Sequence, residues 1–363
     1  MLRAGLIGFP SSGKTTLFQL MTSAREAPRS AAKADANVGV SRVPDERLDR
    51  LTALFNPRKH VPATVEFVDI GHAARTGGTA AQALLDVAPY RTADALLHVV
   101  RAFRDEAVPH PKGSVDPSRD AREMEEELIL ADLGVVERRL ERLERDLKKT
   151  ANAEWKKEQE ILQRCRVQLD GGHALRGLQL EAEDARRLRG FQLLSAKPLL
   201  LVLNLDEADL AHADRAIRDA GFDTLLASGA TRAVPVCAKI ELEIAQLEPA
   251  DAAAFMADLG LTESGLDRVI RASYDLLGYI SFFTVGEDEC RAWSIPRGTH
   301  AQVAAGEIHS DIARGFIRAE VVPHDALLAR GSLAACKEHA ELRLEGKDYV
   351  VQDGDVINFR FAT

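Results

Sequence analysis

The feature that most constrains the fold of this chain is the sequence Gly8-Phe9-Pro10-Ser11-Ser12-Gly13-Lys14-Thr15. Residues 2–7 form an apolar run that predicts a buried strand, and residues 16–21 predict the start of a helix. A G-x-x-x-x-G-K-T loop between a strand and a helix turns its backbone N–H groups inward around phosphate oxygens. The start of the following helix adds partial positive charge. The sequence therefore predicts a phosphate-binding loop (P-loop) in a nucleotide-binding α/β domain.

The residues of this loop have distinct expected roles. Lys14 reaches the outer phosphates and is a candidate catalytic residue, while the Thr15 hydroxyl is placed to bind Mg²⁺. A second predicted strand, residues 63–70, contains Asp69 near its end, and in P-loop NTPases such a carboxylate holds a magnesium-bound water. We therefore expect Mg²⁺ at Thr15 and Asp69. Nucleotide contacts are expected from Phe9, Pro10, Ser11, Ser12, Gly13, Lys14, Thr15 and Thr16.

Composition is typical of a globular protein with reduced cysteines. The 363 residues are enough for two or three domains, and 46% of them are hydrophobic. The net charge of −9 argues against a generally basic nucleic-acid binder, although it allows a local basic patch. The four cysteines are scattered, and no apolar run approaches the roughly 18 residues of a membrane span. We expect a cytoplasmic protein without a signal peptide.

A highly charged helical segment interrupts the α/β pattern from about residue 120 to residue 149. Its apolar residues recur at spacings of three and four, as in a coiled-coil seam: Leu133, Val136, Leu140, Leu143 and Leu147. A second predicted helix carries Trp155, Leu162 and Leu169 and ends at Gly171-Gly172, so the two helices predict an antiparallel hairpin. The charges could simply keep this arm soluble, or the arm could dock on a large partner.

The pattern changes to short strands after Gly278. Residues 327–337 predict a helix between them, which makes this part of the chain an α+β domain. The predicted strands are residues 280–285, 290–295, 316–321 and 356–361.

Four segments carry a resemblance to a known family: Asn37-Val38-Gly39-Val40, Val65-Glu66-Phe67-Val68-Asp69-Ile70, His98-Val99-Val100-Arg101 and Leu128-Ile129-Leu130-Ala131-Asp132-Leu133. Over nearly its whole length the chain resembles the YchF branch of the Obg-related (TRAFAC) P-loop NTPases. The resemblance implies a P-loop nucleotide-binding domain over residues 1–119 and 191–277, a helical coiled-coil insertion over 120–190, and a C-terminal α+β TGS (β-grasp) domain over 278–363. It also implies a monomeric protein linked to translation and redox state, with the ribosome or ribosomal RNA as partner of the coiled coil and the TGS domain.

The base-recognition loop of the resembled family follows the apolar strand predicted for residues 197–204. Most GTPases carry Asn-Lys-x-Asp there, and the Asp accepts two hydrogen bonds from guanine. Here Asn204-Leu205-Asp206-Glu207 has the Asn-x-x-Glu form that YchF proteins carry and that is associated with ATP, since adenine cannot satisfy a guanine-type carboxylate. Asn204 with Leu205 or Glu207 is expected to face the base, and the choice between Asp206 and Glu207 as the facing carboxylate stays open. The sequence Cys237-Ala238-Lys239 resembles the Ser-Ala-Lys loop that packs against the base.

Two departures from the family pattern concern hydrolysis. Lys33 stands where the family has a Thr that closes over Mg²⁺, and a lysine cannot bind a cation. Asp69-Ile70-Gly71-His72 replaces the usual Asp-x-x-Gly. His72 therefore either orients the attacking water or is a loop residue without catalytic duty. His110 matches a family histidine proposed to assist hydrolysis.

These observations predict a protein that binds ATP with Mg²⁺ and hydrolyses it slowly. The candidate catalytic residues are Lys14, His72 and His110. Two alternatives stay open: a degenerate, non-hydrolysing nucleotide-binding module on the ribosome, and a GTP-binding protein of the Obg group. We expect no membrane partner.

Overall fold

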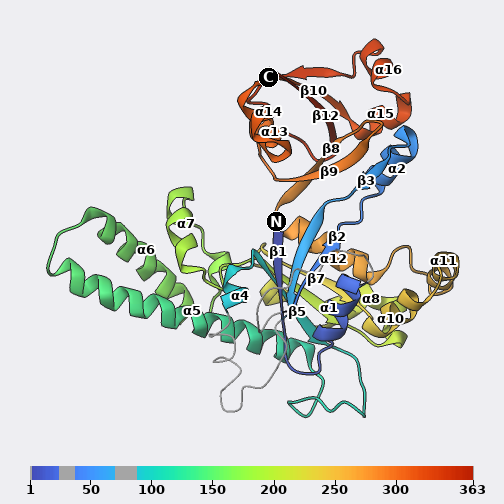
Figure 1. The fold of residues 1–363 in the computed structure, drawn as a ribbon. Helices are drawn as coiled ribbons and strands as arrows, with labels where there is room; N and C mark the ends of the chain where they lie inside the picture. The colour runs from blue at the N-terminus through green and yellow to red at the C-terminus, as the bar shows by residue number, and fades with distance from the viewer. Residues whose placement is uncertain (1, 24–36, 70–87, 363) are drawn as a thin grey trace. The chain divides into compact units, whose positions relative to one another are not determined.

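The computed structural model describes residues 2–23, 37–69 and 88–362 (Figure 1). The chain divides into two compact units. The first comprises Met1–Ser41 and Glu66–Leu276, and the second comprises Arg42–Val65 and Leu277–Thr363. Residues 42–65, which the sequence assigns to the nucleotide-binding domain, thus belong to the C-terminal unit. The helical insertion forms part of the first unit in this division, and its separation as a domain of its own stays a prediction.

The first unit is built on a six-stranded sheet with the strand order β2-β4-β1-β5-β6-β7. β1 pairs with β5, β5 with β6 and β6 with β7, all in parallel. Every residue of β5 and β6 is buried, which is typical of central parallel strands covered on both faces. The strands are β1 Leu2–Ile7, β2 Asn37–Arg42, β4 Thr64–Asp69, β5 Ala95–Arg101, β6 Leu199–Asn204 and β7 Thr231–Val236.

The helices of the first unit surround this sheet and extend beyond it (Figure 1). The helices described are α1 Lys14–Ser23, α4 Ala88–Thr92, α5 Pro117–Leu147, α6 Ala153–Asp170, α7 Ala182–Leu188, α8 Ala213–Asp219, α9 Asp223–Leu226, α10 Ala238–Gln246, α11 Pro249–Asp258 and α12 Gly265–Leu276. Short 3₁₀ turns lie at η1 Leu175–Gly177, η2 Arg189–Phe191 and η3 Glu207–His212. None of the helices in the described ranges is both long and apolar enough to cross a membrane.

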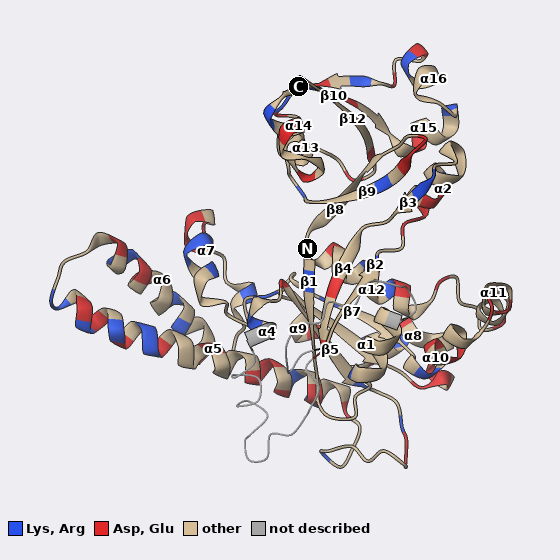
Figure 2. Cartoon of the chain, in the orientation of Figure 1, with Lys and Arg blue, Asp and Glu red and all other residues tan. Residues whose placement is uncertain are grey.

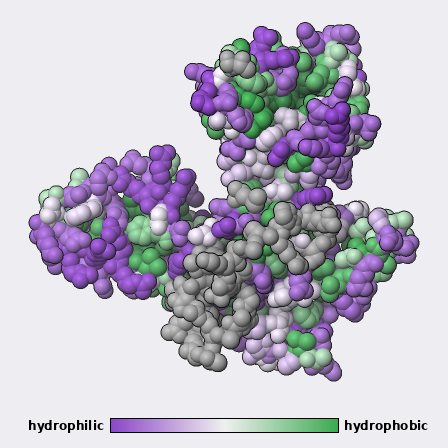
Figure 3. Space-filling model, in the orientation of Figure 1, coloured by the Kyte–Doolittle hydropathy of each residue, from purple (hydrophilic) through white to green (hydrophobic). Residues whose placement is uncertain are grey.

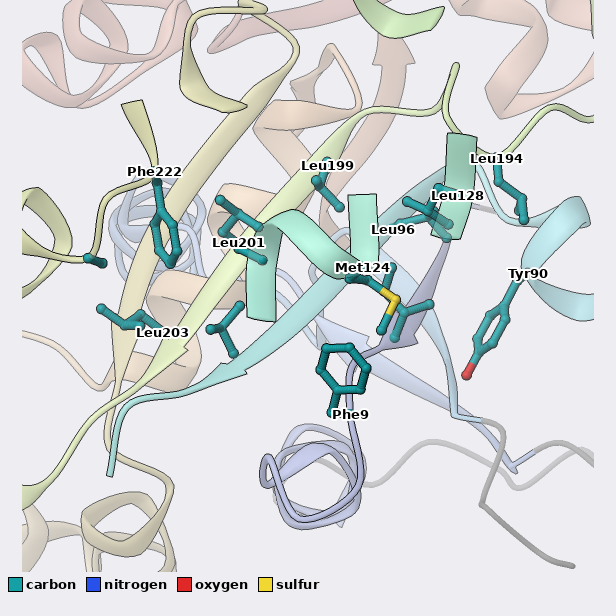
Figure 4. Close-up of a cluster of buried hydrophobic side chains, with 14 of the residues drawn as sticks. Phe9, Tyr90, Leu96, Met124, Leu128, Leu194, Leu199, Leu201, Leu203 and Phe222 are labelled. Atoms are coloured by element: carbon teal, nitrogen blue, oxygen red, sulfur yellow. The ribbon is translucent and has the colours of Figure 1, made fainter. Parts of the chain in front are cut away.

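The 31-residue helix α5 belongs to two cores. Near its start, Met124 and Leu128 pack against Leu199 and Leu201 of β6, in the buried cluster that covers one face of the sheet (Figure 4). Further along, the buried Asp132 carboxylate accepts hydrogen bonds from the Leu194 and Ser195 N–H groups (2.9 and 2.7 Å) and from the Ser195 hydroxyl (2.7 Å). The root of α5 is therefore fixed to the nucleotide-binding core.

The second half of α5 pairs with α6 in the predicted helical hairpin. Val136, Leu140 and Leu143 of α5 are buried against Leu162 and Leu169 of α6, which confirms the apolar seam. Acidic and basic residues alternate along both helices (Figure 2), and the space-filling view shows the visible surface of this hairpin as mainly hydrophilic (Figure 3). A bidentate pair links the two helices, with Arg139 Nε and Nη2 2.6 and 2.9 Å from the Glu158 carboxylate.

The second unit holds another six-stranded sheet, of mixed direction, in the order β11-β10-β12-β8-β9-β3. Its helices are α2 Glu46–Phe55, α13 Ala301–Ile308, α14 Ser310–Arg314, α15 His324–Arg330 and α16 Leu333–Glu338. Its strands are β3 Lys59–Val61, β8 Tyr279–Thr284, β9 Glu289–Pro296, β10 Phe316–Pro323, β11 Arg343–Glu345 and β12 Asp355–Phe361. The single helix predicted for residues 327–337 is wrong, because Gly331 ends α15 in a left-handed conformation (φ 78°) and the Ser332 hydroxyl caps α16.

Residues 42–65 are integrated into the second unit by backbone and side-chain contacts. β3 adds a parallel edge strand to β9, and Leu48 and Leu51 of α2 are fully buried. The Arg47 guanidinium bonds Asp45 (2.8 Å) and Asp353 (3.0 Å) and stacks 5.3 Å from the Phe283 ring centre. The pairing joins residues more than 220 positions apart in the sequence.

Candidate nucleotide-binding site

The P-loop adopts a conformation that depends on its glycines. Gly8 and Gly13 have positive φ angles of 144° and 95°. A side chain at Gly8 would lie 2.5 Å from the Val99 carbonyl oxygen, and one at Gly13 would overlap the Asn204 carboxamide. The loop then enters α1, where the Leu17 N–H donates to the Gly13 carbonyl (2.9 Å) and the first N–H groups of the helix lack intrahelical acceptors. These N–H groups form a cradle suited to an anion.

Lys14 lies inside this loop and is 7% exposed. Its ammonium group donates hydrogen bonds to the carbonyl oxygens of Gly8 (2.8 Å) and Phe9 (3.1 Å). Burial lowers the pKa of Lys14 to about 8, against the opposing effect of the Asp69 charge. A cation bonded to two neutral carbonyls is well placed to move onto a phosphate group.

Asp69 is fully buried at the end of β4, close to Lys14. Neither of its carboxylate oxygens makes a hydrogen bond of normal geometry within the described ranges, although the Thr15 hydroxyl is close enough to act on its charge. Burial raises the pKa of Asp69, while the Lys14 charge and the Thr15 hydroxyl act in the opposite direction. An orphaned carboxylate beside a hydroxyl supplies the hard oxygen ligands that Mg²⁺ prefers, so these residues fit the cation.

A pocket of about 950 Å³ adjoins the P-loop at the carboxyl ends of β5 and β6. Sequence-predicted residues that line it are Gly13, Thr16, Asn204, Leu205, Glu207, Cys237, Ala238 and Lys239. Asp206, whose role the sequence left open, also lines it, together with residues that the sequence did not identify: Ala102, Phe103, Arg104, Asp105, Ala208, Asp209 and Leu242. Residues 102–105 follow β5 directly, and the rule that ligands bind beyond the carboxyl ends of parallel strands was the signal that could have identified them.

Asn204 ties three loops of the pocket together and is 3% exposed. Its Nδ2 donates to the Ser12 carbonyl (3.1 Å), and its Oδ1 accepts from the Ala238 N–H (3.0 Å). Both polar ends of the carboxamide are thus used within the protein. The sequence predicts that this side chain faces the base, and in this structure it positions the surrounding loops.

The two carboxylates that the sequence left unassigned have different partners. Asp206 Oδ2 accepts a hydrogen bond from the Arg104 N–H (3.0 Å) and fixes the neighbouring wall of the pocket. Glu207 Oε1 lies 2.6 Å from Lys239 Nζ, in an ion pair whose members are both exposed. Cys237, buried just before α10, has its pKa raised by burial and therefore favours the neutral thiol.

The histidines predicted for catalysis are only partly described. His72 lies outside the described residues, as do Gly71 and Lys33. His110 is described, and its ring is almost fully buried: Nε2 lies 2.8 Å from Asp120 Oδ2, and Nδ1 accepts the Lys112 N–H (3.1 Å). Both ring nitrogens are therefore engaged in this structure.

A parallel sheet whose first strand passes through this loop into α1 places the chain in the class of P-loop nucleotide-binding proteins. Comparison with known proteins narrows the class. The chain is 43% identical over 364 residues to the "Ribosome-binding ATPase YchF" of Bacillus subtilis, covering 99% of both sequences. It is 38% identical to the protein of the same name from Escherichia coli O157:H7, again over 99% of both. These similarities show that the chain belongs to the YchF family.

Further comparisons agree with this assignment. The chain is 35% identical to "Obg-like ATPase 1" of rice (Oryza sativa subsp. japonica), covering 99% of this chain and 92% of the relative. Residues 279–362 match the family profile YchF-GTPase_C, described as a protein of unknown function (DUF933). The solved structure of the Schizosaccharomyces pombe YchF GTPase superposes with a TM-score of 0.84 at 28% identity, covering 99% of this chain and 97% of that one.

Proposed function

We propose that the protein binds ATP together with Mg²⁺ and hydrolyses it slowly. The observation that supports this proposal is that the P-loop and the pocket beyond β5 and β6 are continuous with each other. Gly13 and Thr16 belong to the P-loop and the first turn of α1, and they also line the pocket beyond β5 and β6. A triphosphate on the loop would therefore place its base in that pocket. The names of the relatives, ribosome-binding ATPase and Obg-like ATPase, support the same reaction.

The engaged carboxylates favour ATP over GTP. A guanine site needs a carboxylate that accepts two hydrogen bonds from the base. Asp206 already accepts from the Arg104 N–H, and Glu207 is paired with Lys239. Adenine makes no such demand, so its binding leaves these pairs intact. A guanine that used one of these carboxylates would have to displace its present partner.

The residues of the loop have separate tasks in the proposed reaction. The backbone N–H groups of residues 11–16 and the Lys14 ammonium hold the phosphates, and Lys14 exchanges its two carbonyl acceptors for phosphate oxygens. The Thr15 hydroxyl and the Asp69 carboxylate would hold Mg²⁺, Asp69 through a water molecule. The metal, when bound, neutralises charge that develops on the phosphates.

Slow hydrolysis follows from the state of the candidate histidines. A general base needs an accessible ring nitrogen near the attacking water, and both nitrogens of His110 are engaged. We propose that His110 acts only after it leaves Asp120, with His72 as the other candidate for orienting water. The same engagement of His110 favours the second candidate function, a nucleotide-binding module on the ribosome that does not hydrolyse ATP.

The ribosome is the proposed partner of the two peripheral parts of the chain. We assign residues 120–190, which hold most of α5 and all of α6, to a coiled-coil arm, and residues 278–363 to a TGS domain. The charged outer surface of the arm and the names of the bacterial relatives support this assignment. We also propose that the protein is a cytoplasmic monomer with three domains.

Turnover measurements test the proposed function and separate its alternatives. We expect ATP hydrolysis to be slow in the isolated protein and faster with ribosomes. Lys14→Ala should abolish hydrolysis under both conditions. An enzyme that prefers GTP would be an Obg-type GTPase. ATP binding without turnover, with or without ribosomes, would identify the non-hydrolysing module.

A further inference from the structure

Arg101, the last residue of β5, is a buried cation that has no role in the reaction proposed above. Its side chain is 2% exposed, and no carboxylate pairs with it among the described residues. Its Nη1 is buried without a hydrogen-bond partner in the same ranges. Removing a guanidinium from water without a counter-charge costs free energy, so this residue does not lie there for stability.

The Arg101 guanidinium contacts the loop that follows β5. Nε donates to the Phe103 carbonyl (3.2 Å) and Nη2 donates to the Asp105 carbonyl (3.4 Å). The guanidinium carbon lies 4.4 Å from the centre of the Phe103 ring, within the range of a cation–π contact. Residues 102–105 are the wall of the nucleotide pocket that the sequence analysis missed.

The other side of this wall is fixed by the base-recognition loop. The N–H groups of Ala102 and Phe103 both donate to the Asn204 carbonyl (2.9 and 3.1 Å), and the Arg104 N–H donates to Asp206. These bonds hold the main chain of the wall. The Arg101 guanidinium contacts the Phe103 ring itself, 4.4 Å from its centre.

We propose that Arg101 is a positioning residue for nucleotide specificity: it holds residues 102–105 as a preformed wall for the purine, and does not touch the phosphates. This inference rests on the proposed function, because it assumes that the pocket takes the base of a nucleoside triphosphate. An arginine suits the task because its planar fork can bond two carbonyls and stack on a ring at the same time. A lysine ammonium can bond carbonyls or lie over a ring, but it is a point charge without the planar fork that does both at once.

The test compares a ligand that has a base with one that lacks it. Dissociation constants of Mg·ATP and of magnesium with inorganic tripolyphosphate are measured calorimetrically for the wild-type protein, Arg101→Lys and the control Arg122→Lys. Arg122 lies on the surface of α5 and is 67% exposed, so the control makes the same chemical change outside the site. We expect Arg101→Lys to weaken ATP binding about tenfold, leave tripolyphosphate binding within about twofold, and leave kcat at saturating ATP unchanged.

A second variant guards against a folding defect in Arg101→Lys. Phe103 is half-buried, so Phe103→Ala removes the stacked ring at little risk to the fold, and we expect the same selective loss of ATP affinity. The double variant should be no weaker than the worse single variant, because both changes disable one wall. Unchanged ATP affinity in Arg101→Lys, equal weakening of both ligands, or additive losses would overturn the inference. If the wild-type protein binds tripolyphosphate but gains nothing from the adenosine part, the proposed function fails as well.

Discussion

The Asn204 carboxamide nitrogen donates a hydrogen bond to the Ser12 carbonyl oxygen, 3.1 Å away. This bond links the end of β6, where the base is expected, to the loop that cradles the phosphates. The same side chain accepts the Ala238 N–H at 3.0 Å. Three loops that are distant in the sequence thus share one buried amide.

Substitution of Asn204 should therefore weaken nucleotide binding, because the side chain holds two loops of the site in place. Asn204→Ala leaves two buried main-chain groups unpaired, at a cost of about 1–3 kcal/mol each. We expect ATP affinity to fall on the order of tenfold and the melting temperature of the first unit to drop. Asn358→Ala, which removes an exposed amide that bonds Glu320, is the matched control for both measurements. A binding constant equal to that of the control would contradict the linking role.

Gly13 is predicted to tolerate no side chain. Its φ of 95° and the overlap that an added methyl group would make with Asn204 both oppose Gly13→Ala, which should abolish measurable ATP binding. Gly172 has a φ of 74° and no atom within 4 Å of an added Cβ. Gly172→Ala thus carries the backbone strain alone, about 1 kcal/mol, and should bind ATP normally. Equal affinities in the two variants would show that crowding at Gly13 is unimportant.

ATP binding should take up protons at alkaline pH. In the unbound protein burial lowers the pKa of Lys14 to about 8, and an adjacent triphosphate favours the charged ammonium. Binding at pH 8.5 then draws a proton onto Lys14, binding at pH 7 draws almost none, and affinity declines as the pH rises above 8. Calorimetric titrations in two buffers of different ionisation enthalpy count these protons. Buffer-independent heats at pH 8.5 would contradict the buried, partly neutral lysine.

The features of the fold that the sequence predicts are those specified by residues close together in the chain. The P-loop and the α5–α6 seam are specified by residues close together in the chain, and both are confirmed as structure. The wall formed by residues 102–105 has no motif, because its position is set by the pairing of β5 with β6. The pairing of β3 with β9 has no local signal either, since it joins residues more than 220 positions apart. The break of the predicted helix at Gly331 had a local signal, a glycine followed by a capping serine, that was missed.

The second unit should depend on Arg47. This side chain bonds Asp45 and Asp353 and stacks on Phe283, and it is partly buried. Arg47→Ala should lower the free energy of unfolding of the C-terminal unit by about 1–3 kcal/mol. Arg58 lies in the same segment as Arg47 and makes an exposed ion pair with Asp288. Arg58→Ala breaks this pair and should lower the free energy of unfolding by less than about 0.5 kcal/mol. Denaturant unfolding compares the two variants, and equal losses would show that residues 42–65 are not anchored through Arg47.

Acid should destabilise the protein through His98. This residue is buried on β5, and burial, with a further effect of the Lys14 charge, lowers its pKa to about 3 from the ordinary 6.5. Between those pH values the unfolded chain binds a proton that the native state does not, so stability falls as the pH falls through this window. The slope approaches 1.4 kcal/mol per pH unit, about the value for one proton. His98→Leu should show a shallower decline in urea unfolding from pH 6.5 to 4, and an unchanged slope would exclude His98 as the cause.

The central claim is that the loop from Gly8 to Thr15 and the pocket beyond β5 and β6 form one site for a nucleoside triphosphate. Calorimetric titration of the full-length protein with Mg·ATP, beside Lys14→Ala, tests it most directly. We predict saturable binding at one site per chain in the wild-type protein and binding weakened at least about tenfold in the variant. Absence of binding heat with the wild-type protein, at several temperatures, or equal affinities in the two proteins would contradict the account.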